Sequence, residues 1–172
     1  MKTKEITVPY FLHKAKNHPT MKEYYLKEIK RGPINKYGSI YNTDWHVKSH
    51  INYSFFINQI QENLNEMVKF FKVKECIFHN AWFQQYKKNS FHSWHTHCNA
   101  HYTNVYYLEG GQGKTEVRDP FTLKTLKMDV KEGDILSLPA FLLHRSPTFK
   151  TNTTKTIIAF NTSFLSLNDE DI

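Results

Sequence analysis

The sequence predicts a mainly β protein of the α+β class, in which short strands form a sandwich or barrel and helices from the first half of the chain pack on one face. The prediction depends on a change of period. Apolar residues recur at steps of three and four up to about residue 71, and at steps of two from Lys74 onward. Turn-forming residues then separate many short strand-like segments, which is typical of sandwiches and barrels.

Two helices are expected before the strands. Thr20-Met-Lys-Glu23 has the form of a capping box, and Gly32-Pro33 would stop the helix that it begins. A second helix is expected from Ser54 to about Phe71, with one buried apolar stripe. The stripe comprises Phe56, Ile57, Ile60, Leu64, Met67, Val68 and Phe71. Residues 34–53, between the helices, form a polar and aromatic segment of a length that usually carries function or folds over something.

The strand pattern begins at residues 76–83, where side chains are expected to alternate between two faces. One face would hold Cys76, Phe78, Asn80 and Trp82, and the other Ile77, His79, Ala81 and Phe83. Further strands are expected at residues 102–108, 115–118, 123–128, 134–138 and 155–163. We therefore expect a single domain over residues 1–172, with a helical and loop region (1–73), a β core (74–164) and an acidic tail (165–172).

Composition narrows the class of protein. Hydrophobic residues make up 40% of the 172 residues and aromatic residues 15%, which argues against disorder. Apolar runs are too short for a membrane span, and the N-terminal residues lack a signal-peptide apolar region. Cys76 and Cys98 have no CxxC spacing, so disulfide and zinc-thiolate frameworks are disfavoured and a reducing, cytoplasmic location is expected.

The net charge of +7 raises the hypothesis of nucleic-acid binding. The lysines are spread along the chain and mixed with acids, and the densest runs, at residues 27–31 and 69–74, are typical of solvated helix faces. Nucleic acid is therefore the less favoured partner. Attraction of acidic substrates or of a dianionic co-substrate explains the charge equally well.

A pair of histidines is the strongest chemical signal. His95 and His97 stand at i and i+2, which places both on the same side of an extended strand. His144 follows a Gly133-x5-Pro139 element, in which Pro139 would end a buried strand and the chain would bend back. Three imidazoles would fill one face of a metal ion and leave positions open for catalysis. Single histidines are more often surface residues, and His101 ranks below His144 because it requires a regular strand past Cys98.

Several segments together resemble the 2-oxoglutarate/Fe(II)-dependent oxygenases, in particular the small, often phage-encoded branch related to prolyl hydroxylases. The resemblance spans roughly residues 35–164 and implies a double-stranded β-helix, a jelly-roll or cupin-like barrel with the metal at its open end. The segments are Ser39–Ser49, Trp94-His-Thr-His97, Val105-Tyr-Tyr-Leu108, Gly133–Pro139, His144 and Ile157-Ile-Ala-Phe-Asn161.

The resemblance assigns His95 and His144 to the two iron-binding histidines of the family. His97 stands where most members have Asp or Glu, so the ligand set would be three histidines. A carboxylate would bring the Fe(II) site to a charge of +1, whereas three neutral imidazoles leave it at +2. A missing carboxylate ligand could otherwise come from Glu116, Asp119 or Asp134, although turns place these less well.

The resemblance also implies a 2-oxoglutarate site. Lys155, on the strand after His144, falls where the family anchors the far carboxylate with a cation. Tyr86 and Tyr107 are candidate hydroxyl donors to the co-substrate, and Asn161 is expected to line the pocket on the same strand face as Lys155. Arg145 is a weaker candidate for an anionic group near the mouth, because it would point away from His144.

The implied activity is that of a hydroxylase that uses Fe(II), 2-oxoglutarate and O2, with ascorbate as a reductant. The resemblance favours a peptide or protein residue such as proline as the substrate, with small molecules as the alternative, and a host cytoplasm if the protein is viral. Candidate walls and lid of the pocket are Trp82, Phe83, Trp94 and residues 34–53.

Two other interpretations stay open. The spacing also resembles the two cupin motifs, and cupin dioxygenases use three-histidine iron without 2-oxoglutarate. Against this, His101 occupies the cupin glutamate position and Phe141 the glycine position of the second motif. The third interpretation is a non-catalytic β-sandwich binding module with a basic surface for sugar or nucleic acid, in which the histidines are incidental.

Overall fold

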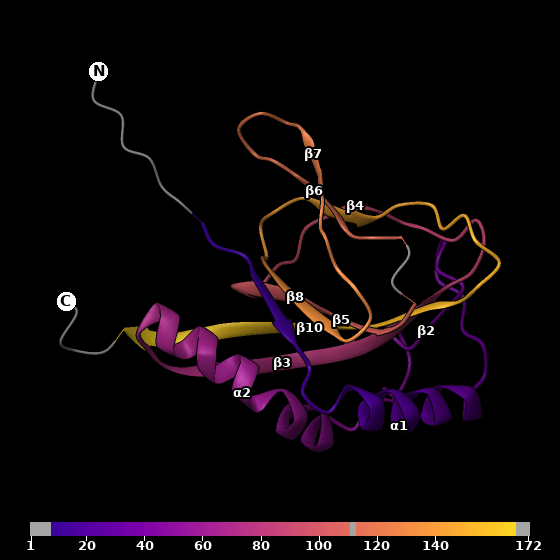
Figure 1. The fold of residues 1–172 in the computed structure, drawn as a ribbon, viewed down its shortest axis with the longest axis horizontal. Coiled ribbons are helices and arrows are strands. Elements are labelled where there is room, and N and C mark those ends of the chain that lie inside the picture. Colours follow the sequence, from indigo (N-terminus) through magenta and orange to yellow (C-terminus); the bar gives the residue numbers. More distant parts are fainter. Residues whose placement is uncertain (1–7, 111–112, 168–172) are drawn as a thin grey trace.

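The computed structural model describes residues 8–110 and 113–167 and contains two antiparallel sheets with two helices on one side (Figure 1). Helices α1 (His18–Arg31) and α2 (Tyr53–Phe71) cover the face of the larger sheet that points away from the smaller one. The prediction of a mainly β, jelly-roll fold with helices packed on one sheet is therefore confirmed. Most of the acidic tail expected at 165–172 lies outside the described residues.

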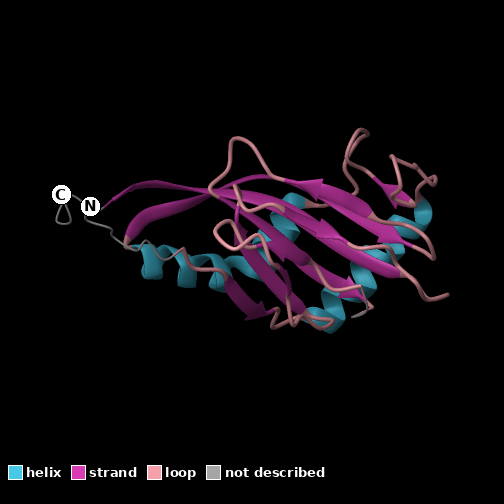
Figure 2. Cartoon of the chain, turned by 90° about the horizontal axis from the view of Figure 1, so that it is seen from above, coloured by secondary structure: helices cyan, strands magenta, loops and turns pink. Residues whose placement is uncertain are grey.

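The larger sheet has the strand order β1-β8-β5-β10-β3-β2, and the smaller one β4-β9-β6-β7. Seen from above, the strands of both sheets lie over the helices (Figure 2). The strands of the larger sheet are β1 (Phe11–Lys14), β2 (Asn42–Thr43), β3 (Val73–Tyr86), β5 (Tyr102–Glu109), β8 (Asp134–Pro139) and β10 (Lys155–Leu167). Those of the smaller sheet are β4 (His92–His95), β6 (Glu116–Arg118), β7 (Thr125–Lys127) and β9 (His144–Ser146).

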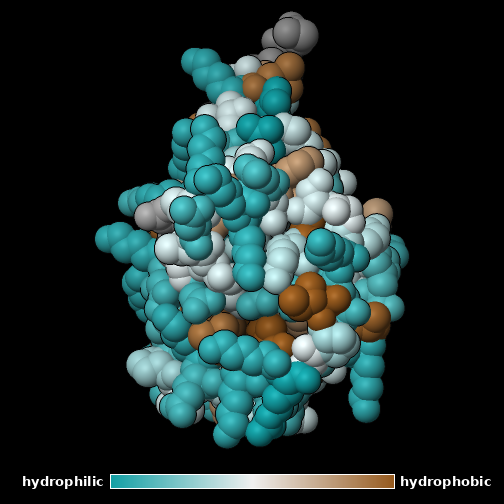
Figure 3. Space-filling view, turned by 90° about the vertical axis from the view of Figure 1, so that its right-hand side faces the viewer, coloured by the Kyte–Doolittle hydropathy of each residue, from teal (hydrophilic) through white to brown (hydrophobic). Residues whose placement is uncertain are grey.

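The core is divided by the larger sheet into two clusters. One lies between the helices and this sheet, where Phe56 of α2 packs on Phe160 of β10 and Tyr106 of β5. The other lies between the sheets and includes Tyr86, Tyr107 and residues of β8. Hydrophilic side chains cover most of the face seen in Figure 3, where hydrophobic residues reach the surface in a few separate patches. No helix in the described ranges is both long and apolar enough to cross a bilayer.

The second helix was predicted well, but the start of the first was not. Helix α2 begins one residue before the expected Ser54, and the side chain of Asn52 caps it by accepting from the Phe55 N–H at 3.1 Å. Helix α1 begins at His18 rather than at the supposed capping box, so Thr20 lies inside the first turn. Pro19 explains the difference, because its fixed φ and missing N–H suit the first turn of a helix.

The region expected to be only helical and loop-like contributes two strands to the larger sheet. Strand β1 pairs with β8, with Phe11 opposite Ser137, and β2 pairs with β3. Both strands are short, and their partners lie more than 40 residues away in the sequence. Strands of four and two residues are too short to show an alternating pattern in the sequence, and they form because distant strands pair with them.

A β-bulge in β3 overturns the expected alternation of residues 76–83. Asn161 of β10 is opposite Asn80, but the next residue, Thr162, is opposite Phe78, so His79 is the extra residue. Phe78 consequently packs against the helix-side cluster, whereas Asn80 lines a pocket on the other face of the sheet. The prediction that these two side chains share a face is wrong, because one inserted residue reverses the alternation.

Candidate metal centre

The structure brings the three predicted histidines to one place between the two sheets. His95 ends β4 and His144 begins β9, and the two are direct partners in the antiparallel ladder, with ring centroids 4.3 Å apart. The ring of His97 lies 5.2 Å from each of the other two. One nitrogen from each ring lies within 4.8 Å of the others, so a single metal ion can contact all three.

His97 reaches this position from a loop and not from the strand on which it was expected. Strand β4 ends at His95, two residues earlier. The backbone N–H of His97 donates to the Ala140 carbonyl at 2.9 Å, which ties this loop to the connection between β8 and β9. The indole of Trp82 also stacks on the His97 ring, with centroids 6.0 Å apart and planes inclined by 21°.

Backbone carbonyls orient two of the three rings. Nδ1 of His95 lies 2.8 Å from the Ser93 carbonyl, and Nδ1 of His144 lies 2.9 Å from the Leu142 carbonyl. A carbonyl oxygen only accepts, so Nδ1 must carry the hydrogen in each ring. Nε2 then has a free lone pair, which is the form that binds a metal.

The cluster keeps its imidazoles neutral. Burial is the main reason that the pKa of His144 falls to about 3, and the neighbouring His95 adds to the effect. Burial likewise lowers the pKa of His95, and it lowers that of His97 to about 4. All three rings are therefore unprotonated at neutral pH, so binding a cation requires no proton release from them.

The other candidate ligands lie elsewhere. Glu116 is bound by Arg145, whose Nε donates to it at 2.8 Å, so this carboxylate is engaged in an ion pair and not by the cluster. Asp119 accepts from the backbone of its own turn, and Asp134 pairs with Lys14. His101 accepts through Nδ1 from the backbone N–H of Phe164 at 3.0 Å.

His92 is a fourth histidine of the site that the sequence argument did not select. Its ring stacks on that of His95 with centroids 3.9 Å apart, and it lines the same pocket. An irregularity in the register between His92 and His95 brings residues three apart to one side of the strand. Simple alternation would place them on opposite faces, so the sequence offered only the local density of histidines as a signal.

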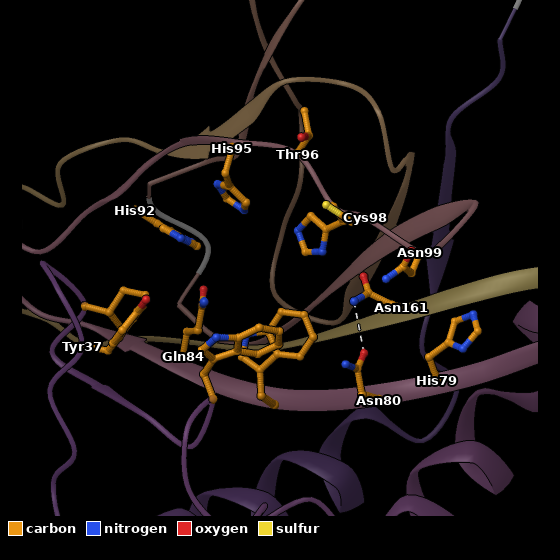
Figure 4. A pocket seen from close by; sticks show the side chains of 14 residues that line it. Tyr37, His79, Asn80, Gln84, His92, His95, Thr96, Cys98, Asn99 and Asn161 are labelled. Atoms are coloured by element: carbon orange, nitrogen blue, oxygen red, sulfur yellow. Dashed lines mark hydrogen bonds between the residues drawn. The ribbon is translucent and has the colours of Figure 1, made fainter.

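A pocket of about 500 Å³ opens beside the histidines (Figure 4). Its lining is aromatic, amide and imidazole in character. In Figure 4, His92 and His95 point into it from the smaller sheet, and Gln84 and Asn80 lie on the opposite side. Trp82 and the segment at residues 34–53 form walls, as expected, and Trp45 contacts Trp82 with ring centroids 4.3 Å apart. Besides these, the lining includes Tyr37, Ile40, His79, Thr96, His97, Cys98, Asn99 and Asn161.

Two of the expected walls are wrong. Phe83 belongs to the core cluster between the helices and the larger sheet. It follows Trp82 along β3, so its side chain lies on the opposite face of the sheet from the pocket. Trp94 alternates with His95 along β4 and lies away from the cluster, where Arg118 and Arg145 stack over its ring at 4.8 and 4.5 Å. Trp94 therefore packs with surface cations and not with the contents of the pocket.

Lys155 is a buried cation behind the histidines. Its side chain is 1% exposed, and Nζ donates to the Gly113 carbonyl and to Ser146 Oγ, each at 2.7 Å. Its hydrogen-bond partners among the described residues are thus neutral, and burial lowers its pKa to about 7. A narrow cavity of about 30 Å³ runs between the three histidines and Ser146, so Lys155 adjoins its inner end.

The remaining predicted residues surround this cavity in different ways. Tyr86 lines the cavity, and the centroid of its ring lies 4.4 Å from Lys155 Nζ. The Tyr86 hydroxyl donates a hydrogen bond to Gln84 Oε1. Tyr107 is buried behind the cavity and shares a hydrogen bond with Thr115. Asn161 lines the larger pocket. Ser146 was missed, although its position two residues after His144 on one strand would have predicted the same orientation.

Comparison of the whole chain with protein-family models and with curated proteins finds no match. Solved structures do match. HygX from Streptomyces hygroscopicus, with nickel and 2-oxoglutarate bound, has a TM-score of 0.68 at 13% identity, over 90% of this chain and 82% of that one. The viral collagen prolyl hydroxylase of Paramecium bursaria Chlorella virus-1 in its 2OG complex has a TM-score of 0.63 at 16% identity, over 91% and 96%.

A Pseudomonas putida prolyl-4-hydroxylase has a TM-score of 0.60 at 10% identity, over 90% of this chain and 92% of that one. These proteins cover nearly the whole chain. Identities of 10–16% relate the proteins by architecture and not by shared sequence. The chain has the fold of the 2-oxoglutarate/Fe(II) oxygenases.

Proposed function

We propose that this protein is an Fe(II)- and 2-oxoglutarate-dependent dioxygenase that hydroxylates a C–H bond, with a peptide or protein residue such as proline as the substrate. The observation that carries the proposal is a narrow cavity lined by three neutral imidazoles and by Ser146, to which a buried lysine, whose partners among the described residues are neutral, donates a hydrogen bond. The nickel and 2-oxoglutarate bound to HygX, which has the same fold, support it.

The donor set fits Fe(II). His95, His97 and His144 would hold the ion on one face, and the carbonyl contacts of His95 and His144 would keep two of the rings in the correct tautomer. Imidazole nitrogens are suitable ligands for iron, and three of them leave coordination positions open. The described residues add no carboxylate to this cluster, so the ligand set is neutral.

The inner cation fits a dicarboxylate. Lys155 would pair with the far carboxylate of 2-oxoglutarate in place of the Gly113 carbonyl and the Ser146 hydroxyl. A buried ammonium without an acidic partner is costly, and an incoming dianion offsets that cost. Fe(II) with three neutral imidazoles carries +2 and the charged Lys155 adds +1, so a 2-oxoglutarate dianion would lower the net charge of the site from +3 to +1. The cavity is narrow, so the co-substrate must displace these contacts of Lys155 as it enters.

When bound, Fe(II) and 2-oxoglutarate supply the oxidising chemistry, which uses O2 to hydroxylate the substrate and releases succinate and CO2. The contribution of the chain is to position and to shield. Trp82 packs on His97 and, with Trp45, walls the pocket against solvent. The aromatic and amide lining suits an uncharged segment that has an apolar ring and hydrogen-bonding groups, as a proline-containing peptide does.

Succinate release from 2-oxoglutarate with Fe(II), measured for the wild type and for His144→Ala, tests the proposal. The variant should lose turnover and bind Fe(II) far more weakly, because only two imidazoles remain. His101→Ala is a matched control, since this histidine lies in the same stretch of sequence but outside the cluster. Equal succinate release from the wild type and His144→Ala would contradict the proposed function.

The three-histidine set also favours a cupin-type dioxygenase that does not use 2-oxoglutarate. Binding of 2-oxoglutarate separates the two, because the oxygenase proposal requires Lys155→Ala to abolish it while the cupin alternative predicts no binding even by the wild type. Metal analysis tests both against a non-catalytic binding module. After incubation with Fe(II), well below one ion per chain would favour the module.

A further inference from the structure

The outer contacts of His97 differ from those of the other two histidines. His95 and His144 each meet the backbone carbonyl of the residue two positions earlier. His97 meets side chains instead, and its Nε2 lies 3.3 Å from Thr103 Oγ1. A histidine that binds a metal usually donates its other N–H to a carbonyl or carboxylate, which fixes the tautomer and the angle of the ring. The Thr103 hydroxyl can donate or accept, so it does not fix the tautomer of His97 by itself, and a side-chain oxygen that only accepts is still required.

Asn161 is an acceptor in the right place. It stands on β10 with only 7% of its surface exposed, and its Nδ2 donates to Asn80 Oδ1 at 3.1 Å (Figure 4). Its own Oδ1 is buried and has no partner of normal hydrogen-bond geometry within residues 8–110 and 113–167. A buried carbonyl oxygen left unpaired is costly, because it has lost its hydrogen bonds to water, so this oxygen calls for a nearby donor.

The donor that fits is the imidazole of His97. Asn161 is directly opposite Thr103 in the pairing of β10 with β5, and Thr103 Oγ1 lies 3.3 Å from Nε2 of His97. Side chains of directly opposite residues lie on the same face of a sheet, and Asn161 and His97 line the same pocket. Because Nδ2 of Asn161 is already given to Asn80, the accepting atom is Oδ1.

We propose that Asn161, held by Asn80, is a positioning residue that accepts a hydrogen bond from His97 and so turns the other ring nitrogen toward the metal. The inference rests on the proposed function only in requiring that the three histidines bind a metal. A carboxylate ligand has no tautomer to fix. A histidine at position 97 has two tautomers, and only one of them presents a lone pair to the metal. The paired side chains of Asn161 and Asn80, on β10 and β3 of the larger sheet, would select that tautomer.

Co(II) affinity of the metal-free protein, measured by titration of its visible absorption at pH 7, tests the inference without turnover. Asn161→Leu keeps the size of the side chain but removes the acceptor, and should weaken Co(II) binding by about 10- to 100-fold. Asn161→Asp keeps an acceptor oxygen and should bind Co(II) at least as tightly as the wild type. Thermal unfolding of each metal-free variant shows that it is folded.

Measuring the effect of Asn161→Leu in a protein that also carries His97→Asp distinguishes a positioning role from a general disturbance of the pocket. A carboxylate at this position has no ring to orient, so adding Asn161→Leu there should change Co(II) affinity by less than about twofold. In the Zn(II)-loaded wild type, the ring ¹⁵N shifts should also assign a single tautomer to His97, which Asn161→Leu should disturb without affecting His95 or His144.

The inference is overturned if Asn161→Leu binds Co(II) like the wild type, or if it costs as much affinity in the His97→Asp background as it does when His97 is present. Failure of Asn161→Asp to retain affinity would overturn it too. These results differ from failure of the proposed function, in which the wild type would bind Co(II) but release no succinate from 2-oxoglutarate. A wild type that binds no Co(II) would overturn both proposals.

Discussion

The pH dependence of 2-oxoglutarate binding follows from the burial of Lys155. Burial lowers the pKa of this ammonium to about 7 in the protein without co-substrate. A bound dianion favours the charged form, so above pH 7 binding must be accompanied by uptake of a proton. The affinity for 2-oxoglutarate should therefore fall as the pH rises. The three histidines do not contribute, because burial lowers their pKa values from an ordinary value that is already below pH 7.

The size of the effect follows from the charged fraction of Lys155. With a pKa of about 7, half of the molecules carry the charge at pH 7 and about 1% at pH 9. The dissociation constant should therefore rise by about 50-fold between these pH values, which corresponds to about 2.3 kcal/mol. An exposed lysine, with its ordinary pKa near 10.4, would give almost no change over the same range.

Isothermal titration calorimetry of the Mn(II)-loaded protein can measure this affinity, because the redox-inactive substitution prevents turnover. Titrations in buffers of different ionisation enthalpy should show uptake of nearly one proton per 2-oxoglutarate at pH 9. Lys155→Met, of similar length but without charge, should bind weakly and with no pH dependence. A wild-type affinity that stays constant from pH 7 to 9, or a slope that persists in Lys155→Met, would refute the reasoning.

Three further predictions concern the frame around the site. Phe56→Ala should lower the free energy of unfolding by about 3–5 kcal/mol in urea titrations, because Phe56 is fully buried between α2 and the larger sheet. Asp44→Ala should cost about 1–3 kcal/mol in the same assay, since it removes the acceptor of the buried Phe83 N–H at 2.8 Å; an unchanged stability would show that another acceptor replaces the carboxylate. Trp94→Ala should leave the rate of succinate formation unchanged, whereas Trp82→Ala should lower it, because only Trp82 packs on His97. Equal effects of the two tryptophan variants would contradict the assignment of their faces.

Local patterns predicted those elements whose formation depends on neighbours in the sequence. Helix α2 is one of them, because its apolar residues recur at steps of three and four. The histidine pair and the strand that Pro139 ends were also recognisable, because short spacings determine which side chains share a face. The order of these motifs carried the resemblance that led to the fold, although identities with the three solved structures compared above are only 10–16%.

Other features of the site depend on pairing between distant strands. The bulge at His79 sets Asn80 on the opposite face from Phe78, yet it is visible only when β3 is aligned with β10. His92 joins the site through an irregular register between β4 and β9. Such shifts leave no trace in composition or period, so regular alternation gave the wrong side for these residues.

The sequence by itself determined that two helices precede most of the strands and that His95, His97 and His144 are the side chains to bring together. These conclusions rest on spacing along a chain of known geometry. Only the tertiary structure decided that β4 and β9 pair with His95 opposite His144, that Lys155 is buried with neutral partners among the described residues, and that Asn161 and His97 line one pocket. Register, burial and the pairing of polar groups are properties of contacts between segments far apart in the chain, and a local pattern does not specify them.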